Sequence, residues 1–184
     1  MEASLFYNKL HSALGSKVLG REELSGRDAA VIDASALLEA VRLLMTDSDI
    51  ACDMLIDLGG ADYSTHPDPH EKPLCVSYQF YSTKFNQRAW LKVYLPMDKP
   101  ELETLSALFA GANWYERECW DMYGVVFKGH PHLKRLLLYE EFVGHPLRKD
   151  YPILKMQPLI PMRNAVDYEA VAIKNRQDSL EKKA

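Results

Sequence analysis

The sequence predicts an α+β fold, in which an antiparallel sheet with helices packed on one face is followed by an extended, proline-containing C-terminal segment. Stretches with two-residue periodicity predict the strands, and a stretch with apolar residues at helical spacing predicts a core-facing helix. Beyond residue 124, repeated prolines exclude long helices and central strands. We therefore expect an α+β domain over residues 1–124 and a docking segment with a tail over residues 125–184.

The N-terminal part of the predicted domain contains a weak strand at residues 17–24 and a helix at residues 33–45. Asp33 or Ser35 is able to cap the start of this helix. Its apolar residues recur at helical spacing, which predicts that one face of the helix contacts the core. These residues are Leu37, Leu38, Val41, Leu44 and Met45.

Three strands are expected next. The first covers residues 50–58 and ends at Gly59-Gly60, a pair that favours a turn. The other two, residues 74–82 and 89–95, are rich in aromatic and β-branched side chains, which is typical of consecutive antiparallel strands. The proline-rich and histidine-rich stretch at residues 63–73 predicts an irregular surface loop.

A second helix is predicted to begin near residue 98. Asp98 is a suitable N-cap, Pro100 fits the first turn, and Glu101 follows the cap by three residues as in a capping box. We expect this helix to run to Gly111. The resulting order of strand, helix, three strands and helix is typical of an α+β domain with its helices on one face.

Composition limits the class of protein. A formal net charge of -4 argues against nucleic-acid binding, which depends on clustered Lys and Arg. No apolar run approaches the roughly 20 residues that a membrane span requires. The N-terminus lacks the pattern of a secretory signal, and the three scattered cysteines suit a reducing compartment. We expect a cytoplasmic protein with free thiols.

Motifs for bound redox cofactors or catalysis do not occur in the sequence. Three cysteines are too few for an iron-sulfur cluster, which usually needs four thiolates. Neither the Gly-x-Gly-x-x-Gly turn of dinucleotide sites nor the Gly-Lys-Ser/Thr of a P-loop is present, and no nucleophile motif accompanies a histidine. The sequence therefore favours a binding function over chemistry on this chain.

The most informative block is residues 114–152, whose first third predicts a short helix. On this helix Arg117 and Asp121 are four residues apart and are expected to pair, while Glu118 is left for another partner. Gly124 is expected to supply a left-handed C-terminal cap. The alternative interpretation is an exposed, solvated helix on which such pairs contribute only tenths of a kcal/mol each.

Two Gly-His-Pro triplets follow, at residues 129–131 and 144–146. The glycine is conformationally permissive and the proline biases the histidine toward extended geometry, so each triplet predicts a sharp structural bend. A second hypothesis, from a different class of function, is a small metal-dependent enzyme. Its zinc ligands would be Cys119, His130, His132 and His145, although their spacing matches no tight ligand-pair pattern.

As a spaced combination, several residues of this block resemble the signature of the thirty-kilodalton subunit, also called the C subunit, of bacterial NADH-quinone oxidoreductase (complex I). The N-terminal part of the signature comprises Glu116, Arg117, Glu118, Asp121, Tyr123, Gly124, Phe127, Gly129, His130, Pro131, Leu133 and Arg135. The continuation comprises Gly144, His145, Pro146, Leu147, Arg148, Lys149, Asp150, Tyr151 and Pro152.

The resemblance implies a structural subunit of the peripheral arm with no catalytic, cofactor-binding or metal-binding residue of its own. FMN and iron-sulfur clusters would lie on partner subunits, and NAD and quinone would be substrates of the whole complex, which couples electron transfer to proton translocation. The chain would contact chiefly the D subunit, and also the B and I subunits, on the cytoplasmic side of the bacterial inner membrane. A homologous subunit of an energy-converting hydrogenase or ferredoxin-linked dehydrogenase is the alternative.

Under this interpretation the signature residues lie at subunit interfaces or in the structural motif that forms them. Burial of apolar residues would drive association at roughly 25 cal/mol per Å². Arg148, Lys149 and Asp150 would pair with charges of the partner and set the register of docking. The full set of expected interface and motif residues is Glu116, Arg117, Glu118, Asp121, Gly124, His130, Pro131, Arg135, Gly144, His145, Pro146, Leu147, Arg148, Lys149, Asp150 and Tyr151.

Overall fold

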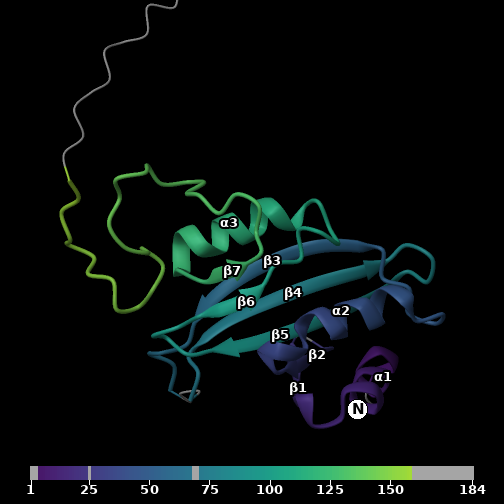
Figure 1. Cartoon of the computed structure of the whole chain (residues 1–184). Coiled ribbons are helices and arrows are strands. Elements are labelled where there is room, and N and C mark those ends of the chain that lie inside the picture. The colour runs from purple at the N-terminus through teal and green to yellow at the C-terminus, as the bar shows by residue number, and fades with distance from the viewer. Residues whose placement is uncertain (1–3, 25, 68–70, 159–184) are drawn as a thin grey trace, which may run out of the picture.

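The computed structural model describes residues 4–24, 26–67 and 71–158, and contains a five-stranded sheet covered by helices (Figure 1). The predicted α+β class is confirmed. The order of strands in the sheet is β1-β2-β5-β4-β3. Their bounds are Val18–Leu24 for β1, Arg27–Ile32 for β2, Met54–Asp62 for β3, Leu74–Ser82 for β4 and Gln87–Leu95 for β5.

The sheet is mixed, because β2 and β5 pair in parallel while the other three pairings are antiparallel. The predicted strands at residues 17–24, 74–82 and 89–95 are present, whereas β2 was not predicted. A parallel pair requires a long crossover connection, and the 54 residues between Ile32 and Gln87 supply it. Strand periodicity specifies which face a side chain occupies, but not which strand lies alongside.

The helices pack against one face of the sheet. Leu74, Val76, Tyr78 and Phe80 alternate along β4 and are buried, and they lie opposite buried residues of β5. They form one hydrophobic cluster with side chains from all three α-helices. The helices are α1 (Leu5–Leu14), α2 (Leu37–Thr46) and α3 (Ala112–Tyr123), and two short 3-10 helices, η1 (Gly15–Lys17) and η2 (Ala34–Ala36), lie beside the first two.

The predicted helix at residues 33–45 is confirmed as η2 followed by α2. Asp33 caps this unit, since its side chain accepts a hydrogen bond from the Ser35 N–H at 3.0 Å. Leu37, Val41 and Leu44 are fully buried, as the helical spacing predicted. Helix α1 was not predicted, although it buries Phe6, Leu10 and Leu14.

The predicted helix at residues 98–111 is wrong. Glu101–Glu103 forms a short strand, β6, which pairs in parallel with β7 (Val126–Lys128), and turns follow it. The pairing buries Leu102 and Phe127, and the Pro100 carbonyl accepts a hydrogen bond from the Val126 N–H at 2.8 Å. These long-range contacts override the local helix-start signal.

The predicted turn at Gly59-Gly60 is also wrong, because β3 starts later than expected and continues through both glycines to Asp62. Gly60 permits a close approach of α3. A Cβ atom at this position would lie 2.5 Å from Cδ2 of Tyr123 and 3.1 Å from Sγ of Cys119. The glycine is therefore required by packing between strand and helix.

Residues 129–158 contain no helix or strand and extend beyond α3, where Figure 1 colours them green to yellow. We reserve the name docking segment for residues 129–158, because Val126–Lys128 form strand β7. The domain boundary at residue 124 stays a prediction, although Val125 and Phe127 still pack in the core. In the part of the chain that the structure describes, no helix is both long and apolar enough to cross a membrane.

Candidate functional site

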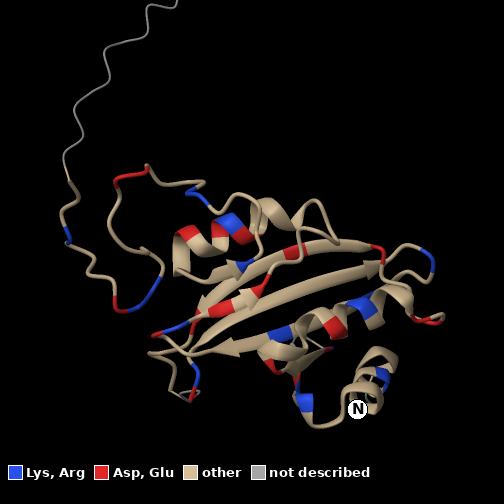
Figure 2. Ribbon diagram, viewed as in Figure 1, with Lys and Arg blue, Asp and Glu red and all other residues tan. Residues whose placement is uncertain are grey.

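The candidate site is the contact between helix α3 and the docking segment. Its predicted cap is confirmed, since Gly124 has φ +79° and its N–H donates to the Trp120 carbonyl at 2.8 Å. A Cβ atom at Gly124 would lie 2.7 Å from the His145 ring, so this glycine also permits the docking segment to approach. Figure 2 shows that α3 carries both acidic and basic residues, whereas β4 carries neither.

Asp121 holds the start of the docking segment on α3. Its side chain is fully buried, and its Oδ2 accepts hydrogen bonds from three successive N–H groups, those of Leu136, Leu137 and Leu138, at 2.9 to 3.0 Å. Its Oδ1 accepts from the Arg135 guanidinium at 2.7 Å. A buried carboxylate is stable only with such a full set of donors.

The predicted pair of Arg117 with Asp121 is therefore wrong, and so is the alternative of a fully solvated helix. Arg117 instead donates to the carbonyls of Lys134 at 3.1 Å and Arg135 at 2.9 Å. Both Asp121 and Glu116 are buried. Glu118 is exposed and makes no hydrogen bond or ion pair within the described residues, and its pairing with another partner stays a prediction.

Two opposing effects act on the pKa of Asp121. Burial raises it, but the N–H groups of Leu138, Leu137 and Leu136 together with the Arg135 guanidinium outweigh that effect and hold the pKa below its ordinary value. The carboxylate therefore remains ionised at neutral pH. An ionised acceptor strengthens each of the hydrogen bonds that fix the segment.

Arg135 connects two parts of the docking segment by hydrogen bonds. Its guanidinium donates to the carbonyls of Phe142 at 2.6 Å and Gly144 at 3.2 Å, in addition to its bond with Asp121. It also lies 5.7 Å from the ring centre of Trp120. Arg135 thus acts within the chain, as a clamp between α3 and residues 142–144.

The two Gly-His-Pro bends are present, with φ +78° at Gly129 and +105° at Gly144. The histidine of each bend bonds to a carbonyl of α3. His130 Nε2 donates to the Asn113 carbonyl at 3.2 Å, while its Nδ1 accepts from the His132 N–H at 3.0 Å. His145 Nδ1 donates to the Asp121 carbonyl at 3.1 Å. Both rings serve as structural hydrogen-bonding groups.

Glu116 is the second buried acid of α3. It accepts hydrogen bonds from the Leu105 N–H at 2.6 Å and from the Thr104 hydroxyl, and its Oε2 lies 4.0 Å from Nε2 of His130. Burial raises its pKa above the ordinary value, although the bonds from Thr104 and Leu105 oppose this. Glu116 thereby joins α3 to the turn after β6.

Replacing Glu116 with glutamine is expected to preserve the fold, with a change in unfolding free energy at pH 7 within about 1 kcal/mol. A raised folded-state pKa stabilises the protein fully below the unfolded pKa, near 4.3, and that stability is lost as pH rises through the folded value. Glutamine cannot titrate, so this component should disappear. Urea unfolding from pH 4 to 8 measures it, with Glu118→Gln as control; equal pH profiles for both variants would contradict the assignment.

The Arg148-Lys149-Asp150 run closes the segment against the sheet. Arg148 donates to the Met97 carbonyl at 2.9 Å and lies 3.4 Å from Asp150, and the Lys149 N–H donates to the Asp62 carboxylate at 2.7 Å. The Lys149 and Asp150 side chains are exposed. Their pairing with charges of a partner stays a prediction.

The metal-enzyme hypothesis is not supported by the geometry. Cys119 is buried beneath Gly60, and burial raises its pKa well above the usual thiol range. Within residues 4–24, 26–67 and 71–158, no group of three or more His, Cys, Asp or Glu side chains is arranged to hold a metal ion. The four expected ligands, Cys119, His130, His132 and His145, are therefore not brought together.

Comparison with known proteins decides the family. The family described as "Respiratory-chain NADH dehydrogenase, 30 Kd subunit" matches residues 30–157. The chain belongs to this family. The C subunit of the NADH-quinone oxidoreductase of Burkholderia ambifaria is 38% identical over 173 residues, which cover 91% of this chain and 86% of the relative. The protein of the same name from Albidiferax ferrireducens is 38% identical over 181 residues, covering 92% and 87%.

Two solved structures also resemble the chain. The Nqo5 trypsin-resistant fragment (1-134) has a TM-score of 0.60 at 30% identity, and the match covers 68% of this chain and 97% of the fragment. A chain of the membrane-bound sulfane sulfur reductase, an archaeal respiratory membrane complex, has a TM-score of 0.58 at 19% identity, covering 80% and 86%. The second likeness shows a shared fold alone.

Sequence reasoning missed the residues outside the motif that form hydrogen bonds with motif residues. Thr104 and Leu105 bind Glu116, Asn113 binds His130, and Asp62 binds Lys149. No local signal in the sequence marks these partners, because each lies 11 to 87 residues along the chain from the group it binds. The family signature locates the docking segment, and the tertiary structure shows what holds it.

The docking segment also exposes several large apolar side chains, which we call the apolar strip. It comprises Leu137, Tyr139, Val143, Leu147, Ile153, Leu154 and Met156, of which the last three are 98%, 92% and 90% exposed. An accumulation of exposed large apolar side chains on one segment favours an interaction surface. In this member of the 30-kilodalton-subunit family, Asp121 and Arg135 hold the backbone at residues 136–138 and 142–144, beside the first members of the strip.

Proposed function

We propose that this chain serves the peripheral arm of an NADH-quinone oxidoreductase (complex I, NDH-1) as a structural docking subunit without a catalytic centre of its own. Membership of that complex follows from the family and from the relatives, which are named as C subunits of NADH-quinone oxidoreductase. The complex transfers electrons from NADH to quinone and couples this to proton translocation. The contribution of this chain would be to hold partner subunits in position.

The observation that carries the proposal is the pairing of a fixed backbone with an exposed apolar strip. Asp121, Arg135 and Lys149 bond residues 135–149 of the docking segment to the domain, which lowers the conformational entropy that this part loses on association. Burial of a single Leu or Ile side chain of the strip contributes roughly 1.5–3 kcal/mol. Several such side chains together would offset part of the free-energy cost of association.

The finer assignments belong to this proposal. The D subunit would be the main partner of the docking segment, with the B and I subunits nearby, on the cytoplasmic side of the inner membrane. FMN and the iron-sulfur clusters would reside on other subunits. The chemistry of the thiols supports this, because burial raises the pKa of Cys52 to about 11 and of Cys75 to about 12, whereas cluster ligands are thiolates.

Replacing Leu154 with serine is expected to leave the isolated chain folded and to lower its affinity for the peripheral arm by roughly tenfold to a hundredfold, the equivalent of about 1.5–3 kcal/mol. Leu154 is 92% exposed, so its loss opens no cavity in the free chain. The yield of assembled complex on a native gel measures the effect.

The matched control for this experiment is Leu19→Ser, at a leucine that is 59% exposed on β1, away from the docking segment. We expect it to assemble normally. Equal yields for the Leu154→Ser and Leu19→Ser chains would contradict the docking role of the apolar strip. Charge reversal at Arg135 is a poorer test, since Arg135 already binds Asp121 within the chain.

The alternative, a subunit of an energy-converting hydrogenase or ferredoxin-linked dehydrogenase, is weaker. The relatives at 38% identity are named as parts of NADH-quinone oxidoreductase. The likeness to the sulfane sulfur reductase chain, at 19% identity, concerns the fold. Mass spectrometry of the proteins that co-purify with the chain distinguishes the two complexes, because only the NADH-linked one contains an FMN-binding input subunit.

A further inference from the structure

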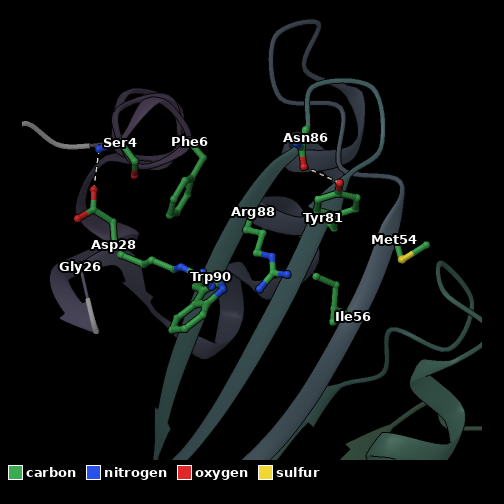
Figure 3. Close-up of a pocket in the computed structure, with 11 residues that line it drawn as sticks. Ser4, Phe6, Gly26, Asp28, Met54, Ile56, Tyr81, Asn86, Arg88 and Trp90 are labelled. Atoms are coloured by element: carbon green, nitrogen blue, oxygen red, sulfur yellow. Dashed lines mark hydrogen bonds between the residues drawn. The ribbon is translucent and has the colours of Figure 1, made fainter.

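A cavity of about 640 Å³ lies where β2 separates from β5, beside the N-terminal end of α1 (Figure 3). The two strands are paired only from residues 29–31 to residues 90–92. Toward Arg27 and Arg88 this pairing ends, and the residues that the structure describes leave the cavity open there. The cavity includes no residue of the docking segment, so it is a separate feature of the domain.

Two arginines give this cavity a positive character. Arg27 lies 5.8 Å from the ring centre of Trp90, and Arg88 lies beside Trp90 on β5. Neither arginine has an ion-pair partner among the residues that the structure describes. The one carboxylate of the lining, Asp28, is already engaged by the Ser4 N–H at 2.6 Å and by Arg21 at 3.8 Å.

The remaining polar groups of the cavity are also mainly donors. The Trp90 Nε1–H is buried and has no hydrogen-bond acceptor in the described part of the chain. The Tyr81 hydroxyl donates to Oδ1 of Asn86 at 2.7 Å, which leaves the Asn86 amide NH₂ for another acceptor. A buried donor without a partner is unfavourable, and a ligand that brings an acceptor removes this cost.

The walls of the cavity between these polar groups are apolar. Phe6, Ile56 and Met54 line the cavity with apolar surface, and Met54 at its rim is 48% exposed. Figure 3 shows Phe6 above Trp90, and Ile56 and Met54 to the right of Trp90, beyond Arg88. The volume is well above that of a single inorganic ion and matches that of sites which hold a peptide side chain or small ligand.

We propose that this cavity binds an acidic segment of a neighbouring protein, with one carboxylate between Arg27 and Arg88 and an adjacent apolar side chain against Trp90 and Ile56. Charge complementarity selects the carboxylate, because both guanidiniums lack a partner ion within the described residues. The apolar walls select a peptide over a small inorganic anion. This contact would be a second anchor of the chain, distinct from the docking segment.

The test places a benzophenone amino acid at Met54 of the full-length chain in the assembled complex and maps the photo-cross-linked peptide by mass spectrometry. The expected product joins Met54 to a peptide of another subunit that contains an Asp, a Glu or a C-terminal carboxylate. The pair Arg27→Glu and Arg88→Glu should lower the yield of this product at least about tenfold, since two charge-assisted hydrogen bonds are lost. Arg42→Glu, at an exposed arginine on α2, should leave the yield unchanged.

Two further measurements separate recognition from misfolding. The milder pair Arg27→Gln and Arg88→Gln should lower the yield in the same direction, as should raising the salt concentration. Changing the identified acid of the partner to arginine should restore cross-linking to the Arg27→Glu, Arg88→Glu chain.

A cross-linked peptide without an acid, a cross-link to a second copy or to residues 159–184, or a yield that the arginine pairs do not change would overturn the proposal. The proposal would also be overturned if the cavity bound inorganic phosphate and no acidic peptide of another subunit were cross-linked to Met54. None of these results would contradict the docking role of residues 129–158, because that role is tested separately by the assembly of the Leu154→Ser chain.

Discussion

Replacing Asp121 with alanine is expected to lower the free energy of unfolding by about 3–5 kcal/mol, the usual cost of removing one member of a buried ion pair. The substitution leaves the Arg135 guanidinium without its carboxylate. It also leaves the N–H groups of Leu136, Leu137 and Leu138 without their acceptor. The start of the docking segment should then detach from α3.

Urea unfolding at pH 7 measures the loss of stability, and hydrogen exchange of the amides at residues 136–138 measures the detachment. Glu118→Ala on the same helix is the matched control, because Glu118 is exposed; it should change stability by no more than about 0.5 kcal/mol. If Asp121→Ala unfolds at the same urea concentration as this control, the anchoring role of Asp121 is refuted.

The same interaction has a defined pH dependence. The pKa of Asp121 lies below its ordinary value, so the ionised carboxylate is the form that stabilises the fold. Its contribution is fully present above the unfolded pKa, near 3.9, and is lost as pH falls through the folded value. The difference in stability between the wild-type chain and Asp121→Asn should therefore diminish below about pH 4, the opposite sign to the Glu116 component.

Replacing Gly60 with valine is expected to lower the free energy of unfolding by about 3 kcal/mol, because the substitution overpacks the contact between β3 and α3. A Cβ atom at Gly60 would lie 2.5 Å from Tyr123 and 3.1 Å from Cys119, so α3 or its side chains must move. The docking segment is bonded to α3 and should be displaced with it. Urea unfolding and the near-ultraviolet circular dichroism of the aromatic residues measure the two effects.

Gly59→Val is a closely matched control, one residue away in the same strand. A Cβ atom at Gly59 would lie 3.9 Å from Oγ of Ser77, which is ordinary van der Waals contact. Valine is favoured over glycine in strands, so this variant should be as stable as the wild type or slightly more so. Equal destabilisation at both positions would indicate a general intolerance of β3 and not a specific approach of α3.

The strands β4 and β5 and the helix α2 could be predicted because their residue periodicity coincides with their burial. Alternate residues of β4 face the core, and the apolar stripe of α2 contacts it. The residues around Pro100 show the opposite outcome. There the residues have the pattern of a helix start, but they form strand β6, which pairs with β7 more than 20 residues away along the chain. Local patterns compete with long-range contacts, and burial of Leu102 and Phe127 decided the competition.

The α+β class, the two bends and the family signature can be predicted without a structure, because each depends on short-range periodicity, on glycine and proline geometry, or on a spaced set of residue types. The donors that bind Asp121, the parallel pairing of β2 with β5 and the cavity at the end of that pairing depend on tertiary packing. A sequence pattern specifies the face on which a residue lies. The residues that it contacts there depend on how segments distant in the sequence pack together. The hydrogen-bond partners of buried polar groups depend on the same packing.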